Sequence, residues 1–387
     1  MKRGVAVPIT PSVLSWAIRE SGYSEVEVAS KVKVNLQVLE SWERGAGQPT
    51  LTLFKKLTSI LKRPAAAFFL PESPKSIIPP VEFRHPWDTE RSLLNPLELR
   101  YLREASRLQR ILSWVIQELG GERLAFPKVS VGSNTEQVAA TIRQNLRIKD
   151  DQKIKWRSSS EALEYWRSTL EDYGILVLLL PLGKASCSGF SLWNDFAPLI
   201  TVNTRWNNEA RIFTLFHEYA HLLSRTNSAC IESGARLLRK DGDQIERWCE
   251  RLAAAVVLPW DEAVTFLRKE CNWTTGEVIT NLNVVRRLAH YFKVSLRATT
   301  LRLIEKGIAT WDLYAEIPLW SDDKPKGGGG GGRHRLQIRE DQYGRRVTNL
   351  FLDAIKKDVM NTTDVINYLD VPYADLEGWR RHQGNKP

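Results

Sequence analysis

The sequence has 387 residues, of which 43% are hydrophobic and 26% charged, with 14 tryptophans. This composition excludes an intrinsically disordered chain, and the length predicts two or three domains, because a domain usually holds about 100–200 residues. The net charge of +10 favours nucleic acid or another polyanion as a partner, although charge spread over so large a surface often serves solubility alone.

The four cysteines show neither C-x-x-C spacing nor the density of a secreted scaffold, which favours free thiols in a reducing compartment. The basic N-terminus lacks an apolar signal core, and the longest apolar run, ILVLLLPL, is too short to span a membrane. We therefore expect a cytoplasmic protein.

The first seventy or so residues contain four short segments with apolar residues at helical spacing. These segments are SVLSWAIRESGY, EVEVASKVKV, LQVLESWERG and LTLFKKLTSILK. The second and third are joined by a short turn at Asn35, which puts Val28, Ala29, Val34 and Leu39 at the apolar contacts of a helix-turn-helix. The sequence predicts a compact helical domain here.

Residues 10–70, including SWERGAGQPTLTLFKKLTSIL, resemble the Xre (phage-repressor-like) DNA-binding family. The side chains placed to reach base edges or phosphates lie at the start and on the exposed side of the third helix: Asn35, Gln37, Val38 and Ser41. Glu40 and Glu43 make this helix acidic, and DNA binding usually draws on phosphate neutralisation. Docking or dimerisation is therefore the alternative role.

The segment PESPKSIIPPVEFRHP follows, and its prolines are expected to block helix and sheet alike, with a domain boundary near Pro74–Pro80. Helices are predicted from about Leu94 to Leu119 and near Asn134–Leu146. Three apolar or alternating runs, GILVLLLP, GFSLWND and PLITVN, then predict a small sheet beside a long helix that begins around Trp206.

That long helix carries the motif H-E-x-x-H within FHEYAHLL. Residues four apart share a helical face, so His217 and His221 can bind one tetrahedral ion while Glu218 acts as the base for its water. The alternatives are two satisfied core histidines, a metal site without activity, and a closed structural zinc site that includes Cys230 and Cys249.

A zinc site needs a third protein ligand, and the next strong helical segment, IERWCERLAAAVVLP, offers Glu246 and Glu250 on one face. Glu246 lies 25 residues after His221. The remaining histidines, His85, His290, His334 and His382, lie far apart in the sequence, and we assign them no role.

From about residue 170 to 305 the chain resembles the ImmA/IrrE metallopeptidase family, through the H-E-x-x-H helix and the later segment that ends in Val256-Val257-Leu258-Pro259. The resemblance implies a zincin-like domain that holds Zn²⁺ with His217, His221 and Glu246. It also implies that Glu250, in place of the family's usual Asn, orients an imidazole. Cys249, Glu250 and Leu252 depart from the family pattern.

From Asp261 the chain is again predicted to be helical. A stripe of apolar side chains is expected to pack on the metal domain: Leu288, Ala289, Phe292, Val294 and Leu301. A second helix-turn-helix is the alternative. Six glycines at 327–332 predict a flexible joint. Two amphipathic helices follow from RRVTNLF onward, the second opening at Thr362 and Thr363.

The sequence therefore predicts an α+β protein that is mostly helical, with a helix-turn-helix bundle, a zincin-like metallopeptidase domain with a small sheet, and a helical C-terminal tail. The predicted segments are the Xre-like domain at 1–73, a proline-containing linker and helical region at 74–165, the metallopeptidase domain at 166–310, a linker at 311–332 and the tail at 333–387.

These features predict a zinc-dependent regulatory endopeptidase in which Glu218 activates a zinc-bound water. The family resemblance implies a helix-turn-helix repressor or a similar protein as substrate. The alternative is a non-proteolytic DNA-binding regulator or the antitoxin-like component of a toxin–antitoxin module, with a toxin as partner. DNA is a further expected partner through residues 1–73, and no membrane partner is expected.

Overall fold

The computed structural model divides into two compact units, Met1–Pro80 with Trp87–Ser106, and Val81–Pro86 with Arg107–Pro387. The residues that it describes are 5–74, 82–83, 96–148, 156–183, 186–225, 228–230, 244–317, 335–369, 371–374 and 376–378. The six-glycine run and most of the predicted boundary at Pro74–Pro80 lie outside these residues. The segment limits given above therefore stay predictions.

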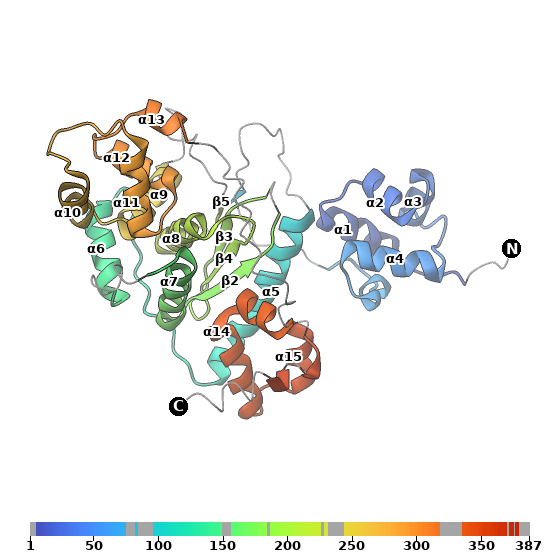
Figure 1. The fold of residues 1–387 in the computed structure, drawn as a ribbon. Helices are drawn as coiled ribbons and strands as arrows, with labels where there is room; N and C mark the ends of the chain where they lie inside the picture. Colours follow the sequence, from blue (N-terminus) through green and yellow to red (C-terminus); the bar gives the residue numbers. More distant parts are fainter. Residues whose placement is uncertain are drawn as a thin grey trace. The chain divides into compact units, whose positions relative to one another are not determined.

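Residues 11–69 of the first unit form four α-helices and a 3₁₀ helix where the sequence predicts a helical domain (Figure 1). These are α1 (Pro11–Ser21), α2 (Glu25–Val32), α3 (Leu36–Glu43), α4 (Leu51–Leu61) and η1 (Ala65–Phe69). α2 opens with a capping box between Ser24 and Glu27, and Lys33, at φ 68°, turns the chain toward α3. One apolar core joins all five elements.

The second unit is built on a five-stranded sheet in the order β1-β5-β3-β4-β2 (Figure 1). Its strands are β1 (Glu82–Phe83), β2 (Leu176–Leu180), β3 (Gly189–Leu192), β4 (Leu199–Asn203) and β5 (Ser228–Cys230). β2 runs parallel to β4, β3 is antiparallel to both β4 and β5, and β1 runs parallel to β5. All five residues of β2 are buried, as expected for a continuous apolar run.

Two of these strands differ from the sequence-based expectation. β2, β3 and β4 correspond to the three predicted runs, whereas β5 follows the long helix and was not expected. The expectation that the prolines around residue 80 block sheet formation is wrong, because β1 pairs with β5 through Glu82 and Phe83. A proline removes only its own amide from a sheet, so a short edge strand can begin shortly after it.

The helices that follow β1, up to residue 315, mostly lie close to their predicted positions. They are α5 (Pro96–Glu118), α6 (Thr135–Asn145), α7 (Ser159–Tyr173), α8 (Asn208–Ser224), α9 (Gln244–Val257), α10 (Trp260–Cys271), α11 (Leu282–Phe292), α12 (Leu296–Glu305) and α13 (Trp311–Ala315). Of these, α7 and α8 pack on the sheet. α7 was missed, although the Ser158 cap and the terminal Gly174 signal a helix. α8 packs against α7, α9, β3 and β4, so the H-E-x-x-H helix lies at the centre of the main core.

The C-terminal part of the described chain forms α14 (Arg335–Lys356) and α15 (Thr362–Leu369). α14 begins ten residues before the predicted tail helix and is broken at Gly344, whose backbone has φ 79° and ψ 168°. It packs against β2 and α7. Within the described residues, no helix is long and apolar enough to cross a membrane.

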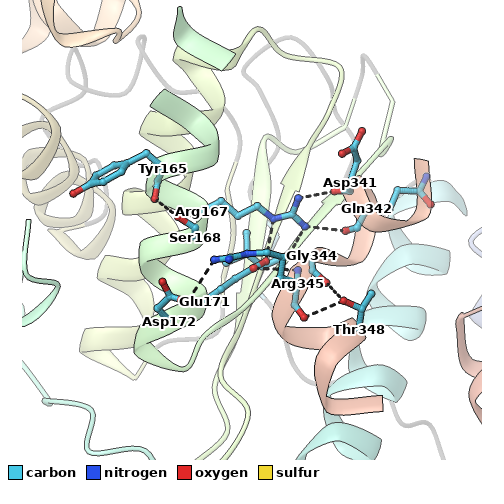
Figure 2. Close-up of polar contacts among 11 residues, drawn as sticks. Tyr165, Arg167, Ser168, Glu171, Asp172, Asp341, Gln342, Gly344, Arg345 and Thr348 are labelled. Carbon is cyan, nitrogen blue, oxygen red and sulfur yellow. Dashed lines mark hydrogen bonds and ion pairs between the residues drawn. The ribbon is translucent and has the colours of Figure 1, made fainter. Parts of the chain in front are cut away.

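A buried ion pair on α7 holds the break in α14 (Figure 2). The Arg167 guanidinium lies 3.1 Å from Glu171 and donates to the carbonyl oxygen of Asp341 at 2.7 Å, before the break. The backbone N–H of Arg345, after the break, donates to the Glu171 carboxylate at 3.1 Å. The cation thus meets carbonyls that end one helical segment, and the carboxylate meets an amide that begins the next, as the helix dipoles favour.

Candidate metal centre

The residues of the H-E-x-x-H motif lie on a long, capped and deeply buried helix. Asn207 caps α8 by accepting a hydrogen bond from the backbone N–H of Ala210 at 2.9 Å. His217, Glu218 and His221 are 5%, 0% and 1% exposed. This burial removes competing water, so that charges within the site interact strongly.

The three predicted metal ligands come together at one point. His217 Nε2 and His221 Nε2 lie 3.1 Å apart. The two carboxylate oxygens of Glu246 each face one ring: Oε2 lies 3.3 Å from His217 Nε2, and Oε1 lies 3.5 Å from His221 Nε2. One ligand atom from each of the three residues lies within 4.8 Å of the others. Among the described residues, this is the cluster of histidine and acidic side chains that could hold a metal ion.

These separations fit a divalent ion. Ligand atoms about 2.0–2.1 Å from a tetrahedral zinc lie roughly 3.3 Å from one another, which is close to the distances between the histidine and carboxylate atoms of the cluster. The donor set of two imidazoles and one carboxylate leaves a fourth position of a tetrahedral ion open. The arrangement can therefore hold a metal ion of the catalytic type.

The electrostatics of the cluster also favour a cation. Burial lowers the pKa of His217, but the hydrogen bond that its ring donates to Glu246 and the charges of Glu246, Glu218 and Glu250 leave that pKa above its ordinary value. Burial alone would raise the pKa of Glu246, yet the hydrogen bonds with His217 and His221 hold it well below its usual range. Three carboxylates thus surround the two imidazoles with negative potential.

Glu218 lies on the side of α8 that faces the sheet, where it meets Gly189 of β3. A side chain at Gly189 would place its Cβ 2.6 Å from the Thr201 carbonyl oxygen, 2.6 Å from Thr214 Cγ2 and 3.4 Å from Glu218 Cγ. Only a glycine lets the strand approach the helix this closely. Sequence reasoning missed Gly189, although an isolated glycine within a strand pattern is a signal for close backbone approach.

Glu250, predicted to orient an imidazole, follows Glu246 by one turn of α9 and is 8% exposed. Its charge is close enough to raise the pKa of His217. Cys249, offered as an alternative ligand, is fully buried in the apolar core, and the side chain of Cys230 lies outside the described residues. Of the histidines without an assigned role, His85, His334 and His382 also lie outside them.

The residues proposed to contact DNA lie in the first unit. Asn35 precedes α3, and Gln37 and Val38 on its first turn are exposed. Ser41 is half-buried, and its hydroxyl donates to the carbonyl oxygen of Val38 at 2.7 Å. The first three side chains thus lie on one accessible surface, while Ser41 is partly engaged within the helix.

Comparison with protein families identifies the region around the metal centre. Residues 170–303 match the family model described as IrrE N-terminal-like domain, Peptidase_M78. The matched segment contains all five residues predicted for the metal site and does not extend to residues 1–73. No curated protein matches the chain. The match supports a metallopeptidase-type function for residues 170–303, which are similar to the IrrE N-terminal-like domain of the Peptidase_M78 family.

Proposed function

We propose that this chain is a zinc-dependent regulatory endopeptidase that hydrolyses peptide bonds of a protein partner such as a helix-turn-helix repressor. The observation that carries the proposal is the convergence of His217, His221 and Glu246 on one buried point, with Glu218 on the same helix. The match to the Peptidase_M78 family over the same residues supports it.

When bound, a zinc ion would polarise the scissile carbonyl and lower the pKa of water. The chain's own residues would supply positioning and proton transfer. His217, His221 and Glu246 would fix the ion, and their mutual contacts, between 3.1 and 3.5 Å, require little rearrangement.

Glu218 would act as general base and then general acid. Its carboxylate would take a proton from the attacking water and deliver it to the leaving amine, so no covalent intermediate with the enzyme would be needed. Complete burial holds this carboxylate in place between α8 and Gly189 of β3. Glu250, one turn beyond Glu246, would orient the His217 imidazole through its charge.

The test uses the full chain loaded with zinc, with unfolded casein and a purified helix-turn-helix repressor as substrates. Glu218→Gln should retain metal and lose cleavage by a factor of roughly 10²–10⁴, because general base catalysis contributes that much. The matched control is Glu209→Gln in the first turn of the same helix, which should leave cleavage unchanged. Cleavage that persists in Glu218→Gln, or no cleavage of either substrate by the metal-loaded protein, would overturn the proposal.

A second proposed role is DNA binding by the first unit, either alongside proteolysis or in a non-proteolytic regulator or antitoxin-like component. The exposed side chains of Asn35, Gln37 and Val38 support it. Arg44, at the end of α3, lies 3.2 Å from Glu40 and offsets part of the acidic charge of this helix. Lys33 is also exposed just before α3.

This second role predicts a salt-dependent shift of promoter DNA by the full chain, because phosphate contacts release counterions. The double substitution Asn35→Ala and Gln37→Ala should weaken binding to the specific sequence more than to random DNA, since base contacts carry specificity. Absence of any shift at low salt would rule the role out.

A further inference from the structure

A pocket of about 190 Å³ opens beside the metal centre, between α8, α9, α12 and α13. Its walls include Phe213, Glu250, Ala254, Ala298, Leu301 and Trp311. Leu301 was predicted as part of a core stripe, and the structure instead places it, half-buried, on this pocket.

The pocket lies one helical turn from the metal ligands on both helices that carry them. Phe213 precedes His217 by one turn of α8, and the two ring centroids are 6.3 Å apart. Glu250 follows Glu246 by one turn of α9, and its charge acts on His217. One turn of helix is about 5.4 Å long, which is short enough for the side chain of a residue next to a peptide bond at the metal centre to reach the pocket.

The walls are mainly apolar, and both cations at the pocket, Arg251 and Arg302, lie near carboxylates. Arg251 is 3.8 Å from Glu305. Arg302 is fully buried, with its guanidinium 2.6 Å from Glu136 and 3.1 Å from Glu305. Such a paired cation offers little attraction for an acidic group, because its charge is already compensated. Trp311 is 36% exposed and offers an aromatic surface to an incoming chain.

The size of the pocket restricts its occupant. Small-molecule sites usually measure about 300–1,000 Å³, so this pocket is too small for a typical cofactor or drug-sized ligand. An apolar cavity of about 150 Å³ binds a benzene ring, and a cavity of this size therefore accommodates one large side chain.

We propose that this pocket receives one large apolar side chain of the substrate, aromatic or of the size of leucine, at a residue adjoining the scissile bond. Ala254 and Leu301 set the depth of the pocket, and Trp311 covers the bound side chain at the rim. This inference rests on the proposed peptidase function, and it adds the class of residue at which the chain cleaves.

The test incubates the zinc-loaded full chain with a synthetic mixture of peptides of known sequence and locates the cleaved bonds by mass spectrometry. Cleavage should concentrate at bonds next to Phe, Tyr, Leu or Met, always on the same side of the bond. Ala254→Leu fills the pocket and should lower kcat/KM for the best such peptide at least about tenfold, while the matched peptide with Ala at that position is retained.

Ala140→Leu adds the same atoms at an exposed position on α6 and serves as the control. Because Ala254 is buried, Trp311→Ala at the exposed rim provides a second variant whose fold is less at risk; it should weaken the preference for aromatic side chains. Metal content is measured for every variant, so that a loss of zinc is not mistaken for a change in specificity.

The outcomes separate the two proposals. Cleavage without side-chain preference, or a preference that neither Ala254→Leu nor Trp311→Ala changes, overturns the pocket inference and leaves the peptidase function in place. If the metal-loaded chain cleaves none of the peptides, nor unfolded casein, the peptidase function and the role of the pocket both fail.

Discussion

His217 and His221 direct their Nε2 atoms at each other across 3.1 Å, inside a core that leaves them 5% and 1% exposed. Two ring nitrogens held this close cannot both present lone pairs without repulsion unless a proton or a metal ion lies between them. The Glu246 carboxylate contacts both rings and adds negative charge. The site is thus arranged for a cation, and either a proton or a metal ion could occupy it.

The first prediction concerns metal binding. His221→Ala and Glu246→Ala should each lose stoichiometric zinc, because two remaining ligands do not complete a zinc site. The exposed Glu122→Gln should keep full occupancy and serves as the control. Metal content measured by mass spectrometry of the purified proteins checks this. Full occupancy in Glu246→Ala would show that another residue supplies the third ligand.

The second prediction concerns pH. In the metal-free protein, the raised pKa of His217 contributes stability that is present below the pKa of the unfolded chain and is lost as pH rises through the folded value. The lowered pKa of Glu246 contributes stability that is present above its unfolded pKa and is lost only as pH falls through the folded value. Zinc should therefore replace a proton on His217 more readily as pH rises.

We expect the increase in Tm caused by a fixed excess of zinc to grow between about pH 6 and pH 8, because histidine titrates in this range. Thermal unfolding with zinc and with a chelator measures the difference. His290→Gln, at an exposed position on α11, is the control and should leave the pH profile unchanged. A zinc-induced shift that is flat or falls with pH would contradict the prediction.

The third prediction concerns Gly189, which allows β3 to approach α8. Gly189→Ala places a methyl group 2.6 Å from both the Thr201 carbonyl oxygen and Thr214 Cγ2. Overpacking of this kind costs about 1–3 kcal/mol of unfolding free energy, and it should also displace Glu218. Chemical denaturation gives the first quantity, and cleavage per bound zinc gives the second. Unchanged stability would mean that the strand moves away without cost.

The fourth prediction concerns the break in α14. Gly344 combines φ 79° with a position at which an added Cβ would lie within van der Waals overlap of the Glu171 carboxylate and 2.7 Å from Arg167 Nη2. Gly344→Ala should therefore separate α14 from the Arg167–Glu171 pair and expose the C-terminal segment to proteases. Limited proteolysis followed by mass spectrometry locates the cuts.

Gly276→Ala is the matched control for this substitution, since Gly276 also has a positive φ, 92°, but an added Cβ there meets nothing within 4 Å. It carries the conformational strain without the steric overlap. If both variants are equally sensitive to protease, backbone strain explains the effect. That result would contradict the role of the Arg167–Glu171 pair in holding α14.

The metal site shows how far local sequence reasoning reaches. H-E-x-x-H places two histidines on one face of any helix, so the pair His217 and His221 follows from helical periodicity. The next helix offered both Glu246 and Glu250 on one face, and periodicity cannot choose between them. The packing of α9 against α8 places Glu246, 3.3 Å from His217, in direct contact, and Glu250 one turn beyond.

The features that sequence reasoning missed depend on contacts between distant residues. β1 and β5 are two and three residues long, and each is stable only because the sheet supplies its partner. Gly189 resembles any strand glycine until α8 lies against it. The break at Gly344 is matched to an ion pair more than 170 residues away.

The helical spacing of the two histidines, the three apolar strand segments and the mostly helical character follow from the amino-acid sequence alone, because they depend on backbone geometry and on side chains a few residues apart. The family resemblance pointed to Glu246 over Glu250, and the packing of α9 on α8 brings that carboxylate to the histidines. The short segments that complete the sheet and the pocket beside the histidine pair became visible only in the folded chain. Those features arise when elements far apart in the chain pack together, and no local pattern specifies which atoms then meet.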